Sequence, residues 1–419
     1  MNAFAILFLA ALLASTGLRL WLASRHVRYI QSHRGAVPPA FSGDIGLDAH
    51  QKAADYSSAK TRLNMLGLVF DAIVLLVLTF GGGLQAIDNL AAAYTSGGLL
   101  RGVVFVAILT VIMSVVELPF DLYRTFGIES RFGFNKMTIG MFFGDLAKQA
   151  AVGAILGLPL LLAVLWLMAG MGDTWWLYVW LVAVAFMLFV QFIAPSVISP
   201  LFNKFVPMQD DERKARIEAL IKRCGFTSSG LFVMDGSKRS SHGNAYFTGF
   251  GKSKRIVFFD TLLSRLEIPE IEAVLAHELG HFRMRHVVKR LALMAVFSLI
   301  FFFVLGQLKN QEWFYQGLHV GFPATDAMAL TLFFMDVPVF TFFLQPLLAM
   351  YSRKHEFEAD QYAAKFTPAR DLVHALVKLY KDNASTLTPD PLHSAFYDSH
   401  PPASIRIARL EQLALKPQS

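Results

Sequence analysis

One short segment of this chain holds two histidines and a glutamate at a spacing that suits metal binding and catalysis. Residues 276–281 read Ala-His-Glu-Leu-Gly-His, so His277 and His281 are four residues apart and Glu278 follows the first of them. On an α-helix, side chains at this spacing lie one above the other on the same face. Two such imidazoles can bind one metal ion, and Glu278 is then placed to hold a water molecule against it. The pattern predicts metal-assisted hydrolysis of a peptide bond, with two solvated surface histidines as the alternative.

The residues around this motif predict a helix. Pro269 suits a first helical turn, where its missing N–H would be unpaired in any case, and Glu270 and Glu272 favour the positive helix start. Apolar residues follow at the spacing of a buried stripe, namely Ile271, Val274, Leu275 and Leu279. Gly280 costs about 1 kcal/mol relative to alanine inside a helix, so we expect another backbone or a substrate to approach it closely. Beyond the motif, we expect His286 to be a surface histidine.

A third metal ligand has to come from elsewhere, because a catalytic zinc ion usually has three protein ligands and one water molecule. Glu356 and Asp360 lie one helical turn apart in a second segment. Glu356 can complete a site of two histidines and one glutamate, and Asp360 can accept a hydrogen bond from a ligand imidazole and so fix its tautomer. On spacing alone, His355 and Glu358 compete with Glu356 as ligands. A solvated acidic helix face is the alternative for the whole segment.

Three further residues are candidates for contact with a substrate. Short β-like runs precede the motif at 231–234, 245–250 and 255–259, and the edge of such a strand can pair with an extended peptide. Asn244, at the start of one run, can hydrogen-bond a substrate backbone or serve as a turn residue. His400 and Arg406 lie on either side of a Pro-Pro helix start and offer two donors for charge that develops on a carbonyl oxygen. A helix cap is the simpler explanation for that segment.

The composition predicts a membrane protein. Of 419 residues, 55% are hydrophobic and only 16% are charged, and the mean hydropathy is +0.47, whereas soluble domains average about 25% charged residues. A membrane-spanning helix needs roughly 20 mostly apolar residues. We predict seven spans, at about 3–23, 63–83, 99–119, 149–171, 175–198, 291–307 and 327–350. The first span begins without positive charge and is long for a signal peptide, so we expect it to be retained.

Lysine and arginine in the loops predict the orientation of the spans. Loops 24–62 and 120–148 are basic, whereas loop 84–98 has no lysine or arginine and loop 308–326 has only one. By the positive-inside rule, the N-terminus is then outside, and segment 199–290 and the tail beyond 351 share the cytoplasmic side. The predicted domains are 1–198 (membrane helices 1–5 with their loops), 199–290 (the metalloprotease domain with the motif), 291–350 (membrane helices 6–7) and 351–419 (the C-terminal part of the metalloprotease domain).

Four acidic residues lie within or at the ends of these spans: Asp71, Glu117, Asp121 and Asp336. Such residues are costly in lipid and usually face protein or water. Helix-end placement or helix–helix hydrogen bonding would explain them, and a water-filled cavity between the helices is the sharper hypothesis. The net charge of +7 is dispersed over the chain and accompanies no nucleic-acid-binding motif. The single Cys224 excludes an internal disulfide and a thiolate zinc site.

Taken together, these motifs resemble the type I CAAX prenyl endopeptidases, the integral-membrane zinc metalloproteases of the a-factor-converting and prelamin-processing type. Besides the seven spans, the shared segments are 132–136, 200–204, 244–247, 255–263, 277–281, 356–360 and 400–402. The resemblance implies one zinc ion per chain. Its implied ligands and neighbours are His277, His281 and Glu356 as metal ligands, Glu278 as general base, Asp360 beside a ligand, Asn244 on the substrate backbone, and His400 with Arg406 at the oxyanion.

The sequence therefore predicts a mainly α-helical, polytopic membrane protein with seven transmembrane helices enclosing a chamber. A cytoplasmic zincin-type metalloprotease domain with a small β-sheet completes it. We expect a zinc endopeptidase that cleaves near the C-terminus of peptides, prenylated or not, or of membrane-associated proteins, and that works as a monomer in a prokaryotic plasma membrane. One alternative is a quality-control metallopeptidase for membrane proteins. Another, of a different class, is a seven-helix transporter or binding protein with a structural zinc ion.

Overall fold

Seven long apolar helical segments form most of the molecule. The computed structural model describes residues 1–248 and 253–415. In this part of the chain, seven segments are long and apolar enough to cross a membrane, which agrees with the predicted number. They are α1 (Ala3–Ser32), α2 (Leu47–Leu78), α4 (Gly98–Leu122) with a π-helical extension (Tyr123–Glu129), α5 (Ile139–Gly170), α6 (Trp175–Ile193) with its continuation to Phe202, α11 (His286–Leu308), and α13 (Asp326–Thr341) with α14 (Gln345–Phe366).

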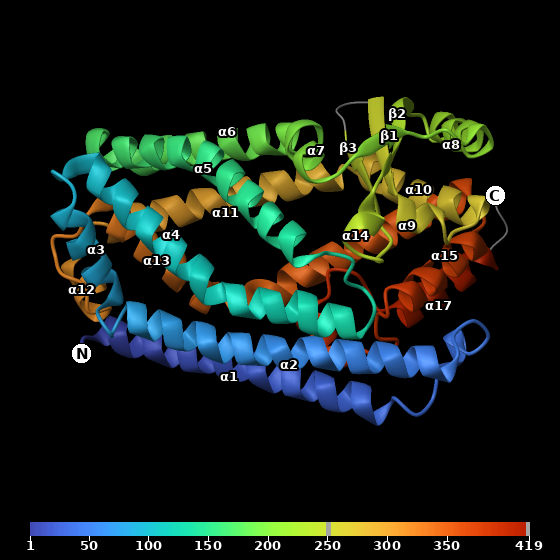
Figure 1. Cartoon of the computed structure of the whole chain (residues 1–419), viewed down its shortest axis with the longest axis horizontal. Coiled ribbons are helices and arrows are strands. Elements are labelled where there is room, and N and C mark those ends of the chain that lie inside the picture. Colours follow the sequence, from blue (N-terminus) through green and yellow to red (C-terminus); the bar gives the residue numbers. More distant parts are fainter. Residues whose placement is uncertain (249–252, 416–419) are drawn as a thin grey trace.

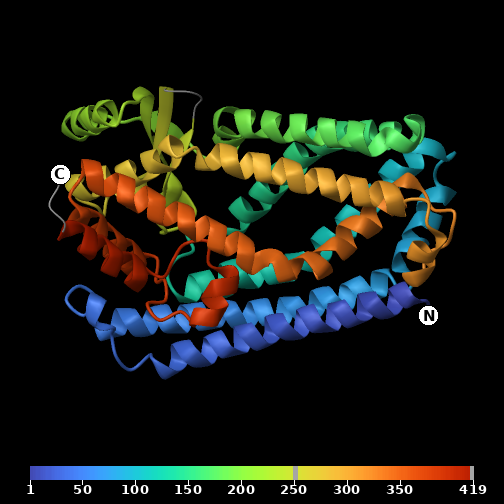
Figure 2. The same cartoon turned by 180° about the vertical axis from the view of Figure 1, so that it is seen from behind.

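Shorter helices lie mainly at the two ends of the molecule. They are α3 (Gly83–Ala93), α7 (Ser199–Phe202), α8 (Asp211–Arg223), α9 (Asp260–Leu263), α10 (Ile268–Arg283), α12 (Glu312–Gly317), α15 (Ala369–Asp382), α16 (Pro391–Tyr397) and α17 (Ala403–Ala414). The N-terminus, α3 and α12 lie at one end (Figure 1). The α1–α2 connection, α8, α10, α15 and α17 lie at the other, and the view from behind shows the same separation (Figure 2).

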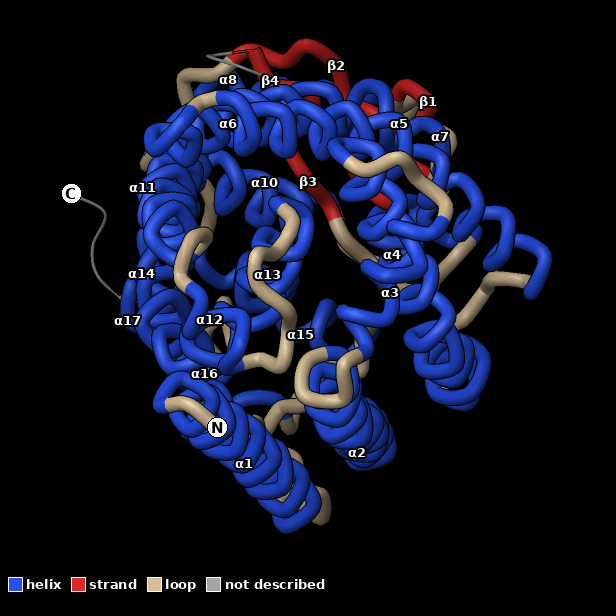
Figure 3. Tube along the Cα trace, turned by 90° about the vertical axis from the view of Figure 1, so that its left-hand side faces the viewer, coloured by secondary structure: helices blue, strands red, loops and turns tan. Residues whose placement is uncertain are grey.

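Seen along the long axis, the helices have a rounded arrangement (Figure 3). Helices α1, α2, α6 and α11 lie toward the periphery, and α10 and α13 lie nearer the centre. Many large apolar side chains of the long helices are exposed, including Leu13, Val111, Ile155 and Phe192. In an aqueous protein such a surface would be unusual, but it suits helices that face lipid.

Two predicted boundaries in the membrane helices are wrong. The predicted loop 120–148 begins too early, because Tyr123–Glu129 continues α4 as a π-helix. The predicted span 175–198 ends too early, because the helical path continues past Pro195 and Pro200 to Phe202. Both prolines lie in the first turn of a new helical segment, where a missing N–H costs no hydrogen bond. The wider π-helical turn between α6 and α7 also relieves the clash of a proline ring with the preceding turn.

A four-stranded mixed sheet lies at the end that carries α8 and α10, in the order β1-β2-β4-β3. The strands are β1 (Phe205–Pro207), β2 (Thr227–Met234), β3 (Ala245–Thr248) and β4 (Ser253–Phe259). Strands β2, β3 and β4 confirm the three predicted runs, although residues 249 and 250 of the second run lie outside the described residues. Strand β1 was missed because three residues are too few for an alternating pattern. Among the described strands, β3 pairs with β4 alone, so it lies at one edge of this sheet.

Helix α10 is held between the sheet-containing part and α14. Its buried stripe is confirmed for Ile271, Leu275 and Leu279, which are fully buried, whereas Val274 is half-buried. Gly280 faces α14, and a Cβ atom built on it would be 3.0 Å from the Cα atom of Ala359. The expected close approach of another backbone is therefore confirmed. The domain division stays a prediction, and its boundaries at 290 and 350 fall inside α11 and α14.

Candidate active site

The sequence at the start of α10 fixes the helix that carries the motif. Glu267 and Glu270 form a capping box, in which each side chain accepts a hydrogen bond from the other residue's backbone N–H, and Pro269 lies in the first turn. Glu270 in this turn and Glu272 just after it are each paired with a cation. Lys378 lies 2.8 Å from Glu270, and Arg216 lies 2.6 Å from Glu272. The start of the helix is therefore tied to α15 and α8.

Three candidate metal ligands meet between α10 and α14. The Nε2 atoms of His277 and His281 are 3.2 Å apart. The carboxylate of Glu356 faces both of them, with Oε2 3.4 Å from His277 Nε2 and Oε1 3.4 Å from His281 Nε2. His277 and Glu356 are buried, and the His281 side chain is 17% exposed. Two residues one turn apart and one residue 75 positions later thus present their ligand atoms to a common point.

The donor atoms fit a zinc ion. Two imidazole nitrogens and a carboxylate oxygen are ligands that zinc accepts, and a catalytic zinc site needs three of them. Glu356 Oε2 is buried and has no hydrogen-bond partner among the described residues, which is costly unless a cation lies beside it. In the described part of the chain, one of two groups of ligand atoms within 4.8 Å of one another comprises His277, His281 and Glu356. This group has the three protein ligands of a catalytic zinc site rather than the four of a structural one.

Asp360 orients the first imidazole. Its Oδ1 lies 2.8 Å from His277 Nδ1, and the Arg406 guanidinium donates to it through Nε at 3.0 Å and Nη2 at 2.6 Å. With the Nδ1 proton donated to Asp360, the Nε2 lone pair of His277 faces Glu356. Burial alone would lower the pKa of His277, but the neighbouring carboxylates of Asp360 and Glu356 raise it to about 9. The same two carboxylates would attract a metal cation to the Nε2 side of this imidazole.

Glu278 and His281 have the protonation tendencies that the chemistry requires. Burial raises the pKa of the Glu278 carboxyl, and the nearby Glu356 adds to that shift. A glutamate with a raised pKa is a better proton acceptor near neutral pH than a solvated one. Burial and the neighbouring His277 lower the pKa of His281 to about 3, so this imidazole is neutral, as a metal ligand must be.

The structure places His400 and Arg406 at the same site in different environments. His400 Nε2 lies 3.4 Å from Glu356 Oε1, and its side chain remains 63% exposed. Arg406 is buried and uses Nε and Nη2 on Asp360, while Nη1 lies 3.7 Å from Glu356 Oε2. Of the two expected oxyanion donors, His400 is thus the accessible one. Arg406 chiefly holds Asp360.

Asn244 lies immediately before the edge strand β3. Its side-chain oxygen accepts a hydrogen bond from the backbone N–H of Ala245 at 2.8 Å, and its backbone oxygen accepts one from Phe259 at 3.0 Å. The first of these contacts leaves the amide NH₂ group of Asn244 unused by the strand. The amide NH₂ group of this exposed side chain is then the part that can donate to a substrate carbonyl.

His286 was expected at the surface, and this expectation is wrong. Its side chain is fully buried and lies between His281 and Glu358. Five residues along one continuous helix would place it on a different face from His281. However, α10 ends at Arg283 and Arg285 takes a left-handed conformation with φ 56°, so α11 starts in a new direction. Only this break, which no glycine marks in the sequence, turns His286 back toward the site.

The acidic residues of the membrane helices line cavities. Asp71, Glu117 and Asp121 line one cavity of about 680 Å³, in which Asp121 pairs with Arg124 at 3.2 Å. Asp336 lines a second cavity of about 1040 Å³, and neither of its carboxylate oxygens has a hydrogen-bond partner among the described residues. All four residues thus line cavities, which agrees with the expectation that they face protein or water rather than lipid.

The fold and the site together define a class, the multi-pass integral-membrane metalloproteases. Sequence profiles match the CAAX prenyl protease N-terminal region with five membrane helices over residues 26–204 and peptidase family M48 over residues 207–414. The chain belongs to the M48 peptidase family and is a CAAX prenyl protease-type member of it. It is a metalloendopeptidase, which confirms the predicted reaction and disfavours the transporter and quality-control alternatives.

Individual relatives cover nearly the whole chain. The CAAX prenyl protease 1 homolog of Caenorhabditis elegans is 33% identical and covers 98% of each chain. The Saccharomyces cerevisiae CAAX prenyl protease 1 is 32% identical over 91% of this chain and 89% of its own. Among solved structures, the crystal structure of S. mikatae Ste24p superposes with a TM-score of 0.91 at 29% identity, covering 98% of this chain and 100% of that one.

Proposed function

We propose that this metalloendopeptidase uses one zinc ion held by His277, His281 and Glu356 to cleave peptides near the C-terminus, including prenylated ones. The observation that carries the proposal is that three ligand atoms lie within 4.8 Å of one another, two of them on α10, the helix that also carries Glu278. A structural zinc site would be closed by a fourth protein ligand, whereas this arrangement leaves one position open.

In the proposed mechanism, separate residues carry out proton transfer, stabilise the developing charge and orient the metal ligands. When bound, a zinc ion lowers the pKa of a coordinated water molecule and polarises a substrate carbonyl. Glu278 accepts a proton from the attacking water at its carboxylate and later donates it to the leaving amine. His400 Nε2 donates toward the carbonyl oxygen as negative charge develops there. Asp360 holds the Nδ1 proton of His277, and Arg406 holds Asp360.

The edge strand β3 supports binding of an extended substrate. A peptide that pairs with its free edge gains backbone hydrogen bonds without a demand on its side chains. Asn244 lies at the start of this strand, and its amide group would fix the register of the peptide. This mode of binding selects for extended, accessible peptide segments rather than for one sequence.

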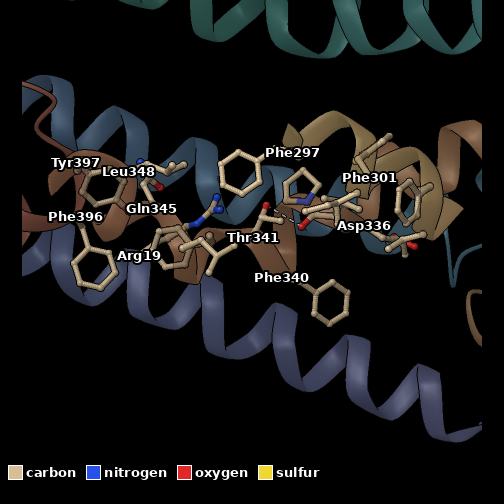
Figure 4. Close-up of a pocket in the computed structure, with 18 of the residues that line it drawn as sticks. Arg19, Phe297, Phe301, Asp336, Phe340, Thr341, Gln345, Leu348, Phe396 and Tyr397 are labelled. Atoms are coloured by element: carbon tan, nitrogen blue, oxygen red, sulfur yellow. Dashed lines mark hydrogen bonds between the residues drawn. The ribbon is translucent and has the colours of Figure 1, made fainter. Parts of the chain in front are cut away.

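The larger cavity supports binding of an apolar chain attached to the substrate. It measures about 1040 Å³ and is lined mainly by phenylalanine and aliphatic side chains of α11, α13 and α14, including Phe297, Phe301 and Phe340 (Figure 4). Ser399 also lines it, and the Ser399 hydroxyl lies 3.0 Å from His400 Nδ1. A prenyl chain in this cavity would therefore lie next to the proposed oxyanion donor. The relatives named as CAAX prenyl proteases agree with such a substrate.

We also propose an orientation in the membrane, a cellular location and an oligomeric state for the protein. The basic α1–α2 connection and the metalloprotease end lie at the same end of the molecule, which supports a cytoplasmic active site and an outside N-terminus (Figure 1). We place the protein in a prokaryotic plasma membrane as a monomer. All the residues proposed for the site come from one chain.

Metal analysis combined with peptide cleavage tests the proposed function. Purified protein should contain one zinc ion per chain, cleave a quenched C-terminal peptide, and lose activity on chelation. Readdition of zinc should restore activity, and a farnesylated peptide should have a lower KM than the same peptide without the prenyl group. Cleavage that survives complete removal of the metal would contradict the proposal. Equal KM values for the two peptides would contradict the prenyl part alone.

A further inference from the structure

A buried histidine cluster lies next to the candidate metal site. His286, at the start of α11, has a side-chain exposure of 0%. Its Nδ1 atom lies 2.9 Å from Nδ1 of His281, and its Nε2 atom lies 2.8 Å from Oε2 of Glu358. The ring of His355 stacks on it, with centroids 3.9 Å apart and planes 10° apart. Both nitrogens of a fully buried imidazole are thus used, and one of them contacts a candidate metal ligand.

These contacts decide where the protons lie. An ionised carboxylate can only accept, so the proton of a neutral His286 is on Nε2, donated to Glu358. His286 Nδ1 is then an acceptor, and the proton between the two rings belongs to Nδ1 of His281. In that tautomer His281 has its lone pair on Nε2, the atom that faces Glu356 at 3.4 Å. The opposite arrangement would put a proton on the atom that has to bind the metal.

We propose that Glu358 and His286 form a positioning relay that orients His281 and fixes its metal-binding tautomer. The inference rests on the proposed metal site and deepens it. Asp360 acts on His277 directly, whereas Glu358 acts on His281 through the ring of His286. Both carboxylates belong to α14, the helix that supplies Glu356, so one helix sets the third ligand and the orientation of both imidazoles.

A second metal site is the alternative for the same residues, because ligand atoms of His286, His355 and Glu358 lie within 4.8 Å of one another. The stacking argues against it. Imidazole binds a metal through a lone pair in the plane of its ring, and two parallel stacked rings direct their lone pairs along parallel planes. His286 also has no free nitrogen, since His281 and Glu358 use both.

Zinc affinity, measured on the purified full-length protein by competition with a chelator of known affinity, tests the relay without relying on activity. His286→Phe keeps an aromatic ring but removes the acceptor, and it should weaken zinc binding by roughly 10- to 100-fold. His286→Asn, whose side-chain oxygen can accept near the Nδ1 position, should restore most of that loss. His355→Phe is the matched control, because it keeps the stacked ring and should leave the affinity unchanged.

Variants of Glu358 provide a second test. The Glu358 side chain is 30% exposed, so its replacement should disturb folding less than replacement of the buried His286. Glu358→Ala should weaken zinc binding, and Glu358→Gln, whose amide oxygen still accepts from His286 Nε2, should weaken it less. Wild-type affinity in folded His286→Phe and Glu358→Ala proteins would overturn the relay. So would two zinc ions per wild-type chain, one of which is lost in His355→Phe. Failure of the wild-type protein to bind zinc would instead overturn the proposed metal site.

Discussion

At the scale of single residues, the site depends on carboxylates that each have one task. Glu356 faces both Nε2 atoms, Asp360 Oδ1 lies 2.8 Å from His277 Nδ1, and Glu278 is the residue that we propose for proton transfer. The sequence predicted these three roles because helical spacing limits which side chains can share a face. Spacing alone did not distinguish Glu356 from Glu358 or His355, and only the resemblance to a known family implied Glu356. The choice depends on how α14 is rotated against α10, and the contact of Gly280 with Ala359 helps to set that rotation.

Replacement of Glu278 by glutamine should separate metal binding from turnover. The amide has nearly the same shape but cannot accept a proton, so turnover should fall by about 10² to 10⁴ or more while zinc content stays near one per chain. Single-turnover cleavage of a quenched peptide and metal analysis of the same sample measure the two quantities. Turnover of wild-type magnitude in Glu278→Gln would remove it as the base.

Arg406 should matter for stability as well as for activity. Among the described residues, Arg406→Leu leaves the buried Asp360 with His277 alone as its partner, and loss of one partner of a buried ion pair costs about 3–5 kcal/mol. Thermal unfolding in detergent should show a clearly lowered Tm. Arg409→Leu is the control on the same helix, because Arg409 lies against the ring of Phe357 and should cost far less. Equal Tm values for the two variants would contradict the role given to Arg406.

At the scale of elements, contact between α10 and α14 brings the two halves of the site together. Gly280 was predicted from sequence to permit a close approach, because a glycine inside a helix needs a reason. Which backbone approaches could not be predicted, since α14 lies about 80 residues later in the chain. The turn between α10 and α11 could not be predicted either. It depends on Arg285 in a left-handed conformation, which is usually adopted by glycine or asparagine.

Gly280→Ala should therefore weaken the site although alanine is the better helix former. Its Cβ atom would lie 3.0 Å from Ala359 Cα and 3.1 Å from Tyr362 Cβ, so α10 has to move away from α14. We expect a lower Tm and weaker zinc binding by chelator competition. Gly153→Ala, on α5 where no atom lies within 4 Å of the new Cβ, should be neutral or stabilising. If the Gly280→Ala protein had the Tm and the zinc affinity of the wild type, the close contact between Gly280 and α14 would not be needed.

At the scale of the whole molecule, composition was enough to predict the seven spans, and loop charge predicts which of their ends face the cytoplasm. Hydropathy finds the apolar part of each helix, but the helices extend beyond it, as α2 does at Leu47 and α4 does to Glu129. The polar ends of such helices have no hydropathy signal. Packing against neighbours, rather than lipid, keeps them helical, so the sequence alone underestimates their length.

Cysteine labelling should show that the two ends of the molecule face opposite sides of the membrane. In a Cys224→Ser background, Ser42→Cys lies in the α1–α2 connection and Ser96→Cys lies between α3 and α4, and both positions are exposed. A membrane-impermeant maleimide added to intact cells should label Ser96→Cys only. Ser42→Cys should react after permeabilisation. The reverse pattern would contradict the proposed orientation, and labelling of both in intact cells would contradict their separation by the membrane.

The most direct test of the metal site is anomalous diffraction at the zinc absorption edge from crystals of the zinc-loaded Glu278→Gln protein. We predict one peak per chain, in contact with the Nε2 atoms of His277 and His281 at about 2.0–2.1 Å and with a Glu356 oxygen at about 2.0–2.2 Å. A peak among His286, His355 and Glu358, or none beside His277, would contradict the account.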